Sequence, residues 1–334
     1  MKIFITGVAG FLGSHLADLM ISEGHTVAGN DNMIGGYTDN VPQNVEFYQV
    51  DCCDLENMTK AMEGCDIVYH TAATAYEGLS VFSPVLVTRN IFEASVTTIT
   101  AAIRNKVKRI VYCSSMARYG HHDKLPYKED YECRPQDPYG IAKKAGEDVL
   151  RNLCDTHGVE YVIAVPHNIV GPRQKYDDPF RNVMSIMLNR MLQGKQPIIY
   201  GDGKQQRCFS YIDDCLYCLN ALAFQDNVVG EVINIGPDEE PITIIKLAEA
   251  CANETGLNLN PIHHDDRPKE VKLAVCSSDK ARQLLGYKTS TNMRQSVKKT
   301  AEYIRTRGTK KLQYNLQLEN VNDKTPDTWK KKLI

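Results

Sequence analysis

The sequence predicts an α/β protein in which a doubly wound parallel sheet is followed by a smaller lobe. Short apolar runs alternate with helical patterns along the first half of the 334-residue chain, an order typical of parallel βα units. After about residue 170, glycine and proline interrupt the alternation, as in "VGPRQ" and "QGKQPIIYGDGKQQ". A second lobe with less regular structure is therefore expected there.

The individual elements follow from these patterns in chain order. Apolar runs predict six strands, at 2–8, 25–32, 45–51, 65–73, 109–115 and 161–172. Helical periodicity predicts helices at 13–24, 83–106 and from 137 onward. In the smaller lobe, strands and helices are expected within 209–222, 231–236, 242–256 and 292–308. The polar residues from about 308 onward carry the only tryptophan, Trp329, and predict a tail or a wrapping arm.

Composition excludes several classes of function. Hydrophobic residues are 43%, charged residues 24% and the net charge is −2, so neither a nucleic-acid partner nor a membrane partner is expected. No run of 18 apolar residues appears, and glycine spacing explains the apolar start better than a signal peptide does. We therefore expect a cytoplasmic protein.

The eleven cysteines are scattered, which predicts reduced thiols. The CxxC of Cys215 and Cys218 lies in a helical pattern, so no metal site is expected.

A glycine-rich turn follows the first strand. In "TGVAGFLG", Gly7, Gly10 and Gly13 stand between a strand and a helix. Glycines let the backbone approach a pyrophosphate, and the helix N-terminus offers unpaired N–H groups with a partial positive charge. A simple tight turn would also explain the spacing, but the context favours a Rossmann-type dinucleotide-binding domain.

Two carboxylates follow the next strands. Asp31 ends the second strand and can accept hydrogen bonds from the adenosine ribose, while it would repel a 2′-phosphate. Because no arginine stands beside it, the sequence favours NAD over NADP. Asp51 closes the third strand, where it faces the adenine or caps the following helix.

A tyrosine and a lysine share one face of the predicted helix that begins at 137. Tyr139 and Lys143 are four residues apart, which places them on one side of a helix. A neighbouring ammonium favours the phenolate, so Tyr139 could act as a base while hydride passes to the cofactor. Ser114 and Ser115 end the fifth strand, at the sheet edge where such folds bind ligands, although strand-end serines also form turns.

These motifs together resemble the extended short-chain dehydrogenase/reductases, in particular the nucleotide-sugar epimerase/dehydratase branch of UDP-glucose 4-epimerase-like enzymes. The resemblance runs from residue 1 to about 305 and includes "TGVAGFLGSHL", "HTAA", "YGIAK", "NIVGPRQ", "IIYGDGKQQRCFSYIDD" and "RPKEV" in order. It implies an NAD-binding domain at 1–168, to which segments near 207–236 return. It also implies a nucleotide-sugar-binding lobe at 169–307, leaving a tail at 308–334. Dimers are common in this family, so a homodimer is expected.

The resemblance also implies roles for individual residues. Tyr139 is similar to the catalytic base, Lys143 to its partner on the nicotinamide ribose, and Ser115 to the residue that binds the sugar hydroxyl. The residues implied to bind the cofactor are Gly7, Gly10, Phe11, Leu12, Gly13, Asp31, Asn32, Asp51, Cys52, Thr71, Ala72, Ala73, Asn90, Tyr139, Lys143 and His167. The residues implied to bind the substrate are Ser115, Asn168, Tyr200, Arg207 and Arg267, with the two arginines on the diphosphate.

Three positions depart from the family pattern. His167 stands in "AVPH", where arginine and aromatic residues are common, so it would face the nicotinamide differently. Arg118 replaces a small or apolar residue and could reach the substrate or an oligomer partner. Glu77 lies in a loop near the expected sugar, where it is either a specificity residue or a solvated charge.

The residues after Ser115 bear on the reaction. Related 4,6-dehydratases carry an acidic pair there and decarboxylases typically a glutamate, whereas this chain has Met116 and Ala117, which move no proton. We therefore predict C4 epimerisation of a UDP-hexose or UDP-N-acetylhexosamine through a 4-keto intermediate. Dehydration or decarboxylation, reduction of a nucleotide sugar, and a non-enzymatic cofactor-binding role remain alternatives, because groups such as Glu77 or Cys113 could move protons instead.

Overall fold

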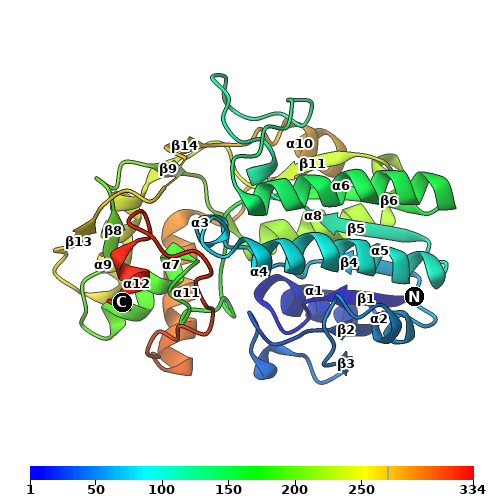
Figure 1. The fold of residues 1–334 in the computed structure, drawn as a ribbon, viewed down its shortest axis with the longest axis horizontal. Coiled ribbons are helices and arrows are strands. Elements are labelled where there is room, and N and C mark those ends of the chain that lie inside the picture. Colours follow the sequence, from blue (N-terminus) through cyan, green and yellow to red (C-terminus); the bar gives the residue numbers. More distant parts are fainter. Residues whose placement is uncertain (269–270) are drawn as a thin grey trace.

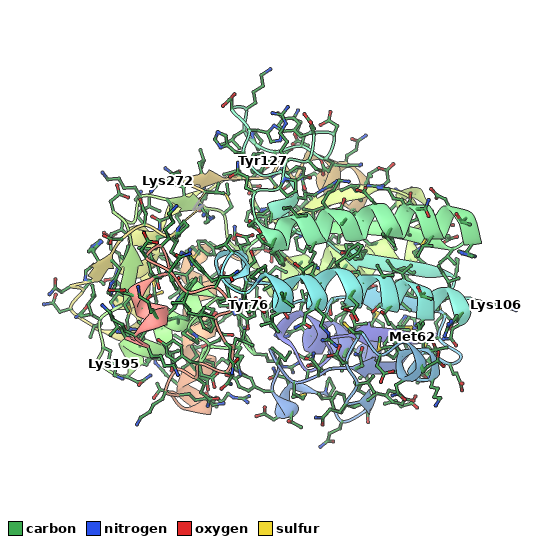
Figure 2. The ribbon with its side chains drawn as sticks, in the orientation of Figure 1. Met62, Tyr76, Lys106, Tyr127, Lys195 and Lys272 are labelled. Carbon is green, nitrogen blue, oxygen red and sulfur yellow. The ribbon has the colours of Figure 1, made fainter. Side chains whose placement is uncertain are left out.

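The computed structural model describes residues 1–268 and 271–334 and consists of two lobes (Figure 1). The chain begins in the larger lobe and ends on the smaller one. Lys106 and Lys195 mark the outer ends of the two lobes, and Tyr76 lies at their junction (Figure 2). The site described below occupies this junction.

The larger lobe is built on a seven-stranded sheet in which every neighbouring pair of strands is parallel. In spatial order its strands are β11 (Val232–Ile235), β6 (Glu160–Pro166), β5 (Arg109–Cys113), β4 (Ile67–His70), β1 (Lys2–Thr6), β2 (Thr26–Asn30) and β3 (Val45–Tyr48). The strand order reverses between β1 and β4, and ligands bind beside such a reversal at the carboxyl ends of the strands. The sheet confirms the predicted α/β, Rossmann-type class.

Helices cover both faces of this sheet. One face packs on α1 (Phe11–Ser22), α8 (Ile212–Phe224) and α10 (Asp279–Leu285) through apolar residues such as Leu16 and Leu219. The other face packs on α2 (Leu55–Ala61), α5 (Ala94–Arg104) and α6 (Pro138–His157) through residues such as Ile99 and Leu150. Both layers consist mainly of buried apolar side chains, which is why the strands read as continuous apolar runs.

A late part of the chain completes the sheet. Helix α8 and strand β11 come after the first residues of the smaller lobe, yet β11 pairs with β6. Arg109 on β5, only 1% exposed, joins these parts. Its guanidinium donates to Glu160, to the carbonyl of Ala223 at the end of α8 at 2.9 Å, and to the carbonyl of Gln225, the residue after α8, at 2.7 Å. These bonds occupy carbonyls that a helix end otherwise leaves unpaired.

The smaller lobe has its own apolar core, formed mainly by α7, α9 and α11. Its elements are β7 (Ile169–Val170), α7 (Val183–Leu192), β8 (Ile198–Tyr200), β9 (Gln206–Arg207), β10 (Ser210–Tyr211), β12 (Ile242–Thr243), α9 (Ile244–Thr255), β13 (Ile262–His264), β14 (Leu273–Ala274) and α11 (Met293–Arg307). Strands of two or three residues make three small sheets, so the lobe depends on helix packing more than on strand pairing.

Two predicted elements are divided in the structure. The strand expected at 161–172 ends at Pro166, because Asn168 adopts a positive φ of 45° and turns the chain so that β7 pairs with β10. Asparagine tolerates this conformation better than most residues. The helix expected at 83–106 is α4 (Pro84–Thr88), a π-helical segment at Arg89–Glu93, and then α5.

The residues after α11 form an arm over the junction of the lobes, which we call the C-terminal arm and define as residues 309–334 (Figure 1). It ends with α12 (Asp327–Lys330). Trp329 is 2% exposed and packs edge-on against Phe82 and Phe180, with ring centroids 6.1 and 5.4 Å away. The arm therefore contacts both lobes, and α3 (Glu77–Ser80) lies beside it.

Among the described residues, no helix is both long and apolar enough to span a membrane. All eleven cysteines are free thiols, and Cys215 and Cys218 are buried on α8.

The contacts of Arg109 generate a stability prediction. Arg109→Met should lower the free energy of unfolding by at least about 2 kcal/mol, since each buried carbonyl left without a partner costs roughly 1–3 kcal/mol. Arg104→Met is the matched control, because Arg104 makes an exposed ion pair with Glu56 at 3.1 Å, worth about 1 kcal/mol or less. Urea titration of both variants measures the difference, and equal losses would contradict a structural role for Arg109.

Candidate active site

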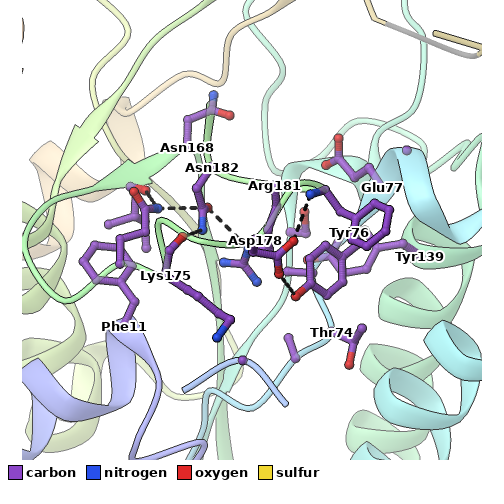
Figure 3. Close-up of a pocket in the computed structure, with 18 of the residues that line it drawn as sticks. Phe11, Thr74, Tyr76, Glu77, Tyr139, Asn168, Lys175, Asp178, Arg181 and Asn182 are labelled. Carbon is purple, nitrogen blue, oxygen red and sulfur yellow. Dashed lines mark hydrogen bonds between the residues drawn. The ribbon is translucent and has the colours of Figure 1, made fainter. Parts of the chain in front are cut away.

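A cavity of about 500 Å³ lies between the lobes. It brings together all but one of the residues that the sequence predicts for the site: Gly7, Gly10, Phe11, Leu12, Gly13, Asp31, Asn32, Asp51, Cys52, Thr71, Ala72, Ala73, Asn90, Ser115, Tyr139, Lys143, Asn168, Tyr200, Arg207 and Arg267. Figure 3 shows part of it, with Phe11 and Tyr139 at opposite sides of the view and Asp178 and Arg181 between them.

The glycine turn has the shape that a pyrophosphate requires. Gly7 has φ +71°, and a Cβ there would lie 2.9 Å from the Cα of Ala72. A Cβ on Gly13 would lie 2.3 Å from the carbonyl oxygen of Gly7. In the described chain no side chain caps the N-terminus of α1, so its first N–H groups remain available to an anion. These residues fit the diphosphate of a dinucleotide.

Asp31 lies where β2 ends and is 7% exposed. Its carboxylate accepts from the backbone N–H of Ala9 at 3.1 Å and of Met33 at 2.7 Å, which fixes it at the cavity wall. Burial raises the pKa of this carboxyl, and the backbone hydrogen bonds oppose that rise. The cap of α2 is Asp54 rather than Asp51, and Asp51 lies on the cavity wall in an ion pair with Arg89 at 3.2 Å.

Tyr139 and Lys143 lie on the buried face of α6. Asp137 caps this helix by accepting from the N–H of Gly140 at 2.8 Å, and Pro138 starts it. The Lys143 ammonium donates to the carbonyl of Cys113 at 2.7 Å, at the carboxyl end of β5. Burial lowers the pKa of Lys143 to about 8 and raises the pKa of the Tyr139 phenol, while a hydrogen bond from Ser115 partly opposes the latter.

Ser115 stands after the end of β5 and begins a short 3₁₀ turn. Its hydroxyl accepts from the N–H of Ala117 at 3.2 Å, so the serine both caps the turn and lines the cavity. Met116 and Ala117 are not part of the cavity wall as the structure describes it. On the far side Asn168 donates to the carbonyl of Cys208 at 2.9 Å, which holds its amide beside the cavity.

Asn90 owes its place to the π-helical segment. Its amide donates to the hydroxyl of Thr74 at 3.0 Å, which ties it to the loop after β4, and it accepts from Arg89 at 3.1 Å. The wider turn changes the angular spacing of a regular helix, and such turns are frequent at functional sites. The helical periodicity of residues 83–106 does not indicate this irregularity.

His167 and Arg118 lie elsewhere than the sequence suggests. His167 does not line the cavity: its ring is 1% exposed and its Nε2 bonds the carbonyl of Pro237 at 3.0 Å. Arg118 reaches neither cavity nor surface. It is 3% exposed and forms an ion pair with Glu147 on α6 at 2.9 Å. Glu147 also accepts from Ser114.

Sequence patterns missed two parts of the cavity wall, the segment between β7 and α7 and the end of the C-terminal arm. Between β7 and α7 this wall includes Lys175, Asp178, Phe180, Arg181 and Asn182, and Ile334 of the arm also lines the cavity. Tyr76 donates to Asp178 across the lobe junction, and the Arg181 guanidinium lies 5.4 Å from the Tyr76 ring (Figure 3). The only signal for this segment was its dense polar, proline-interrupted composition.

Comparison with known proteins places this geometry in a family. Residues 3–236 match the family described as "NAD dependent epimerase/dehydratase family". The chain belongs to this family. Membership confirms the resemblance drawn from the motifs, and NAD is the cofactor of the family.

Individual members support the same grouping. The chain is 30% identical over 307 residues to a protein named putative UDP-glucose 4-epimerase from Methanocaldococcus jannaschii, covering 91% of this chain and 98% of that one. It is 31% identical over 248 residues to a UDP-N-acetyl-alpha-D-glucosaminuronate decarboxylase from Bacillus cytotoxicus, covering 72% and 76%. The structure of UDP-glucose 4-epimerase from Thermotoga maritima with UDP-glucose has a TM-score of 0.87 at 30% identity, covering 92% and 99%.

The position of Asp31 generates a prediction about cofactor choice. Asp31→Ala should weaken NAD binding by about 1–3 kcal/mol, the scale of hydrogen bonds to a charged group. Asp54→Ala is the control, because it removes a carboxylate that caps α2 and is not on the cavity wall. Calorimetric titration with NAD compares the variants. The dinucleotide released by denaturing the wild-type protein should be NAD, and NADP as the main species would contradict the assignment.

The pairing of Arg118 and Glu147 generates a second prediction. Arg118→Met should lower the free energy of unfolding by about 3–5 kcal/mol, because it leaves a buried carboxylate without its counter-charge. Arg118→Met/Glu147→Met should regain part of that loss. Lys144→Met, which removes an exposed ion pair with Asp148 on the same helix, should cost only about 0.3–0.5 kcal/mol. Urea titration tests the series, and a double variant less stable than the single one would refute the pairing.

Proposed function

We propose that the protein catalyses NAD-dependent C4 epimerisation of a UDP-sugar through a 4-keto intermediate. One observation carries the proposal: the cavity wall joins Tyr139, Lys143 and Ser115 to the glycine turn, while Met116 and Ala117 offer no proton-transfer group. Epimerisation at C4 needs only a hydride acceptor and one group that takes and returns a hydroxyl proton. The similarity to proteins named UDP-glucose 4-epimerase supports the same reaction.

Each catalytic side chain has a role in this proposal. Tyr139 takes the proton of the C4 hydroxyl and later returns it, and Ser115 bonds the same oxygen and orients it. NAD, when bound, supplies the reversible hydride acceptor and a positive charge. Since burial raises the pKa of the phenol, Tyr139 needs nearby positive charge to act as a base, and Lys143 provides one such charge on the same helix face.

We assign binding of the nucleotide part of the substrate to the cavity wall that the smaller lobe provides. Arg207 and Arg267 line the cavity and would hold the diphosphate. We assign the ring of Tyr200 to packing against the nucleotide base. The Arg267 guanidinium lies 5.0 Å from the centroid of this ring. A homodimer and a cytoplasmic location stay predictions.

Elimination or decarboxylation is the alternative, and one relative is named a decarboxylase. Such chemistry needs an additional acid or base. Glu77 is the candidate, because it lines the cavity and its charge raises the pKa of Tyr139. The Arg181 cation lowers the pKa of Tyr139 and so opposes the effect of Glu77.

Product analysis in deuterated water separates these reactions. The NAD-loaded protein is incubated with UDP-glucose, UDP-N-acetylglucosamine or UDP-glucuronic acid, and products are identified by NMR and mass. We expect a C4 epimer of unchanged mass without carbon-bound deuterium, since only the hydroxyl proton exchanges with solvent. A product lighter by one water, released carbon dioxide, or deuterium at C5 would replace epimerisation by the alternative.

The role of Tyr139 generates a kinetic prediction. Tyr139→Phe should lower kcat by at least about 100-fold, the lower range for loss of general acid–base catalysis, while KM changes less because the diphosphate contacts are elsewhere. Tyr217→Phe is the control: it removes a hydroxyl that donates to the carbonyl of Leu285, outside the cavity. A Tyr139→Phe enzyme with wild-type kcat would remove Tyr139 from the mechanism.

A further inference from the structure

The C-terminal arm makes specific contacts with both lobes, although the family resemblance in the sequence ends near residue 305. On the larger lobe, Glu319 accepts from the N–H groups of Val85 and Leu86 at 2.8 and 2.9 Å. Ser83 donates to the carbonyl of Gln317 at 2.8 Å. These bonds hold the middle of the arm at the start of α4.

On the smaller lobe, the arm is anchored at two places. The N–H of Gln313 donates to the carbonyl of Asp177 at 2.7 Å. Further along, the hydroxyls of Thr328 and Tyr200 are hydrogen-bonded at 2.6 Å. Thr328 itself is fully buried. Because Tyr200 lines the cavity, this second contact connects the arm directly to a cavity-wall side chain.

Apolar packing joins the two sets of anchors. Trp329 lies between Phe82 of the larger lobe and Phe180 of the smaller one, and its Cη2 would lie 3.3 Å from a Cβ on Gly78. Phe180 and Gly78 both line the cavity. The Tyr314 hydroxyl secures the end of the arm, since it lies 3.0 Å from the carbonyl of Thr328 and 3.1 Å from that of Ile334, either of which can accept its single proton. The arm is thus packed into the site rather than lying loosely on the surface.

We propose that the C-terminal arm is part of the nucleotide-sugar site and that Thr328 is a positioning residue for Tyr200. The Thr328 hydroxyl fixes one end of the tyrosine ring while the Arg267 guanidinium covers its face, which leaves Tyr200 in a single orientation toward the cavity. A ring fixed before binding loses less conformational freedom when a nucleotide base packs on it. This inference rests on the proposed function, because it assumes that a nucleoside diphosphate group occupies this wall.

The test uses the full-length, NAD-loaded chain with UDP, GDP and dTDP as probes in calorimetric titrations. Thr328→Val should weaken binding of the preferred diphosphate about fivefold, the scale of one hydrogen bond. It should raise KM by a similar factor and leave kcat and NAD retention unchanged. Thr328→Ser restores the hydroxyl and should restore binding.

Thr325→Val is the matched control. Thr325 is buried on the same arm at 2% exposure, and its hydroxyl accepts from the N–H of Asn322, which also belongs to the arm. This variant should bind the diphosphate as the wild type does. Fluorescence of Trp329, the only tryptophan, reports in each variant whether the arm remains seated. An unchanged emission maximum in Thr328→Val is expected.

The outcomes separate the two proposals. Wild-type affinity in Thr328→Val, or equal losses in Thr328→Val and Thr325→Val, would overturn the role of Thr328 and leave the proposed function intact. A Thr328→Val variant with red-shifted Trp329 emission and equally lowered kcat would also overturn it, since the loss would then come from release of the arm. A wild-type protein that binds none of the three diphosphates would overturn the proposed function and this inference together.

Discussion

A positive charge held away from water is the constraint on which the active site depends. The Lys143 ammonium is 2% exposed and its main partner is the carbonyl of Cys113, so helix α6 must pack with this face against the end of β5. Gly146 permits that approach, because a Cβ there would lie 2.3 Å from the hydroxyl of Tyr112. Glu147 adds a buried negative charge one turn after Lys143, and Arg118 neutralises it from the end of the turn after β5. Packing and charge together therefore set the position of Tyr139.

The burial of Tyr139 leads us to expect that it is a poor base until the cofactor is bound. An isolated phenol in this environment stays protonated, because removing it from water penalises the phenolate. Lys143 alone does not offset this penalty, since burial disfavours its own charge and one of its N–H groups is directed at a backbone carbonyl. A cofactor whose nicotinamide is positively charged when oxidised adds the missing charge. Cofactor binding and the basicity of Tyr139 are thus expected to be coupled.

The sequence predicted the parts of the molecule that follow regular patterns. The glycine turn, Asp31, Ser115, Tyr139 and Lys143 all lie at the ends of strands or on a helix face, where fixed spacing determines direction. Predictions failed where local geometry departs from that spacing. The positive φ of Asn168 divides a predicted strand, and the π-helical segment around Asn90 divides a predicted helix. Arg118 was expected to reach the substrate or an oligomer partner, and local patterns could not show its pairing with Glu147, which is 29 residues away on another element.

The wall opposite the catalytic helix was the least predictable part, and it is the part that should decide substrate choice. Lys175, Asp178 and Arg181 lie in an irregular segment whose conformation depends on contacts with Tyr76 in the other lobe. In the proposed C4 reaction, Tyr139, Ser115 and Lys143 would act in the same way whatever the sugar carries elsewhere. Selection among nucleotide sugars must then come from charges and shapes around the remaining ring positions. Loops and arms can change these groups without disturbing the sheet, which accounts for relatives about 30% identical to this chain whose names assign them different reactions.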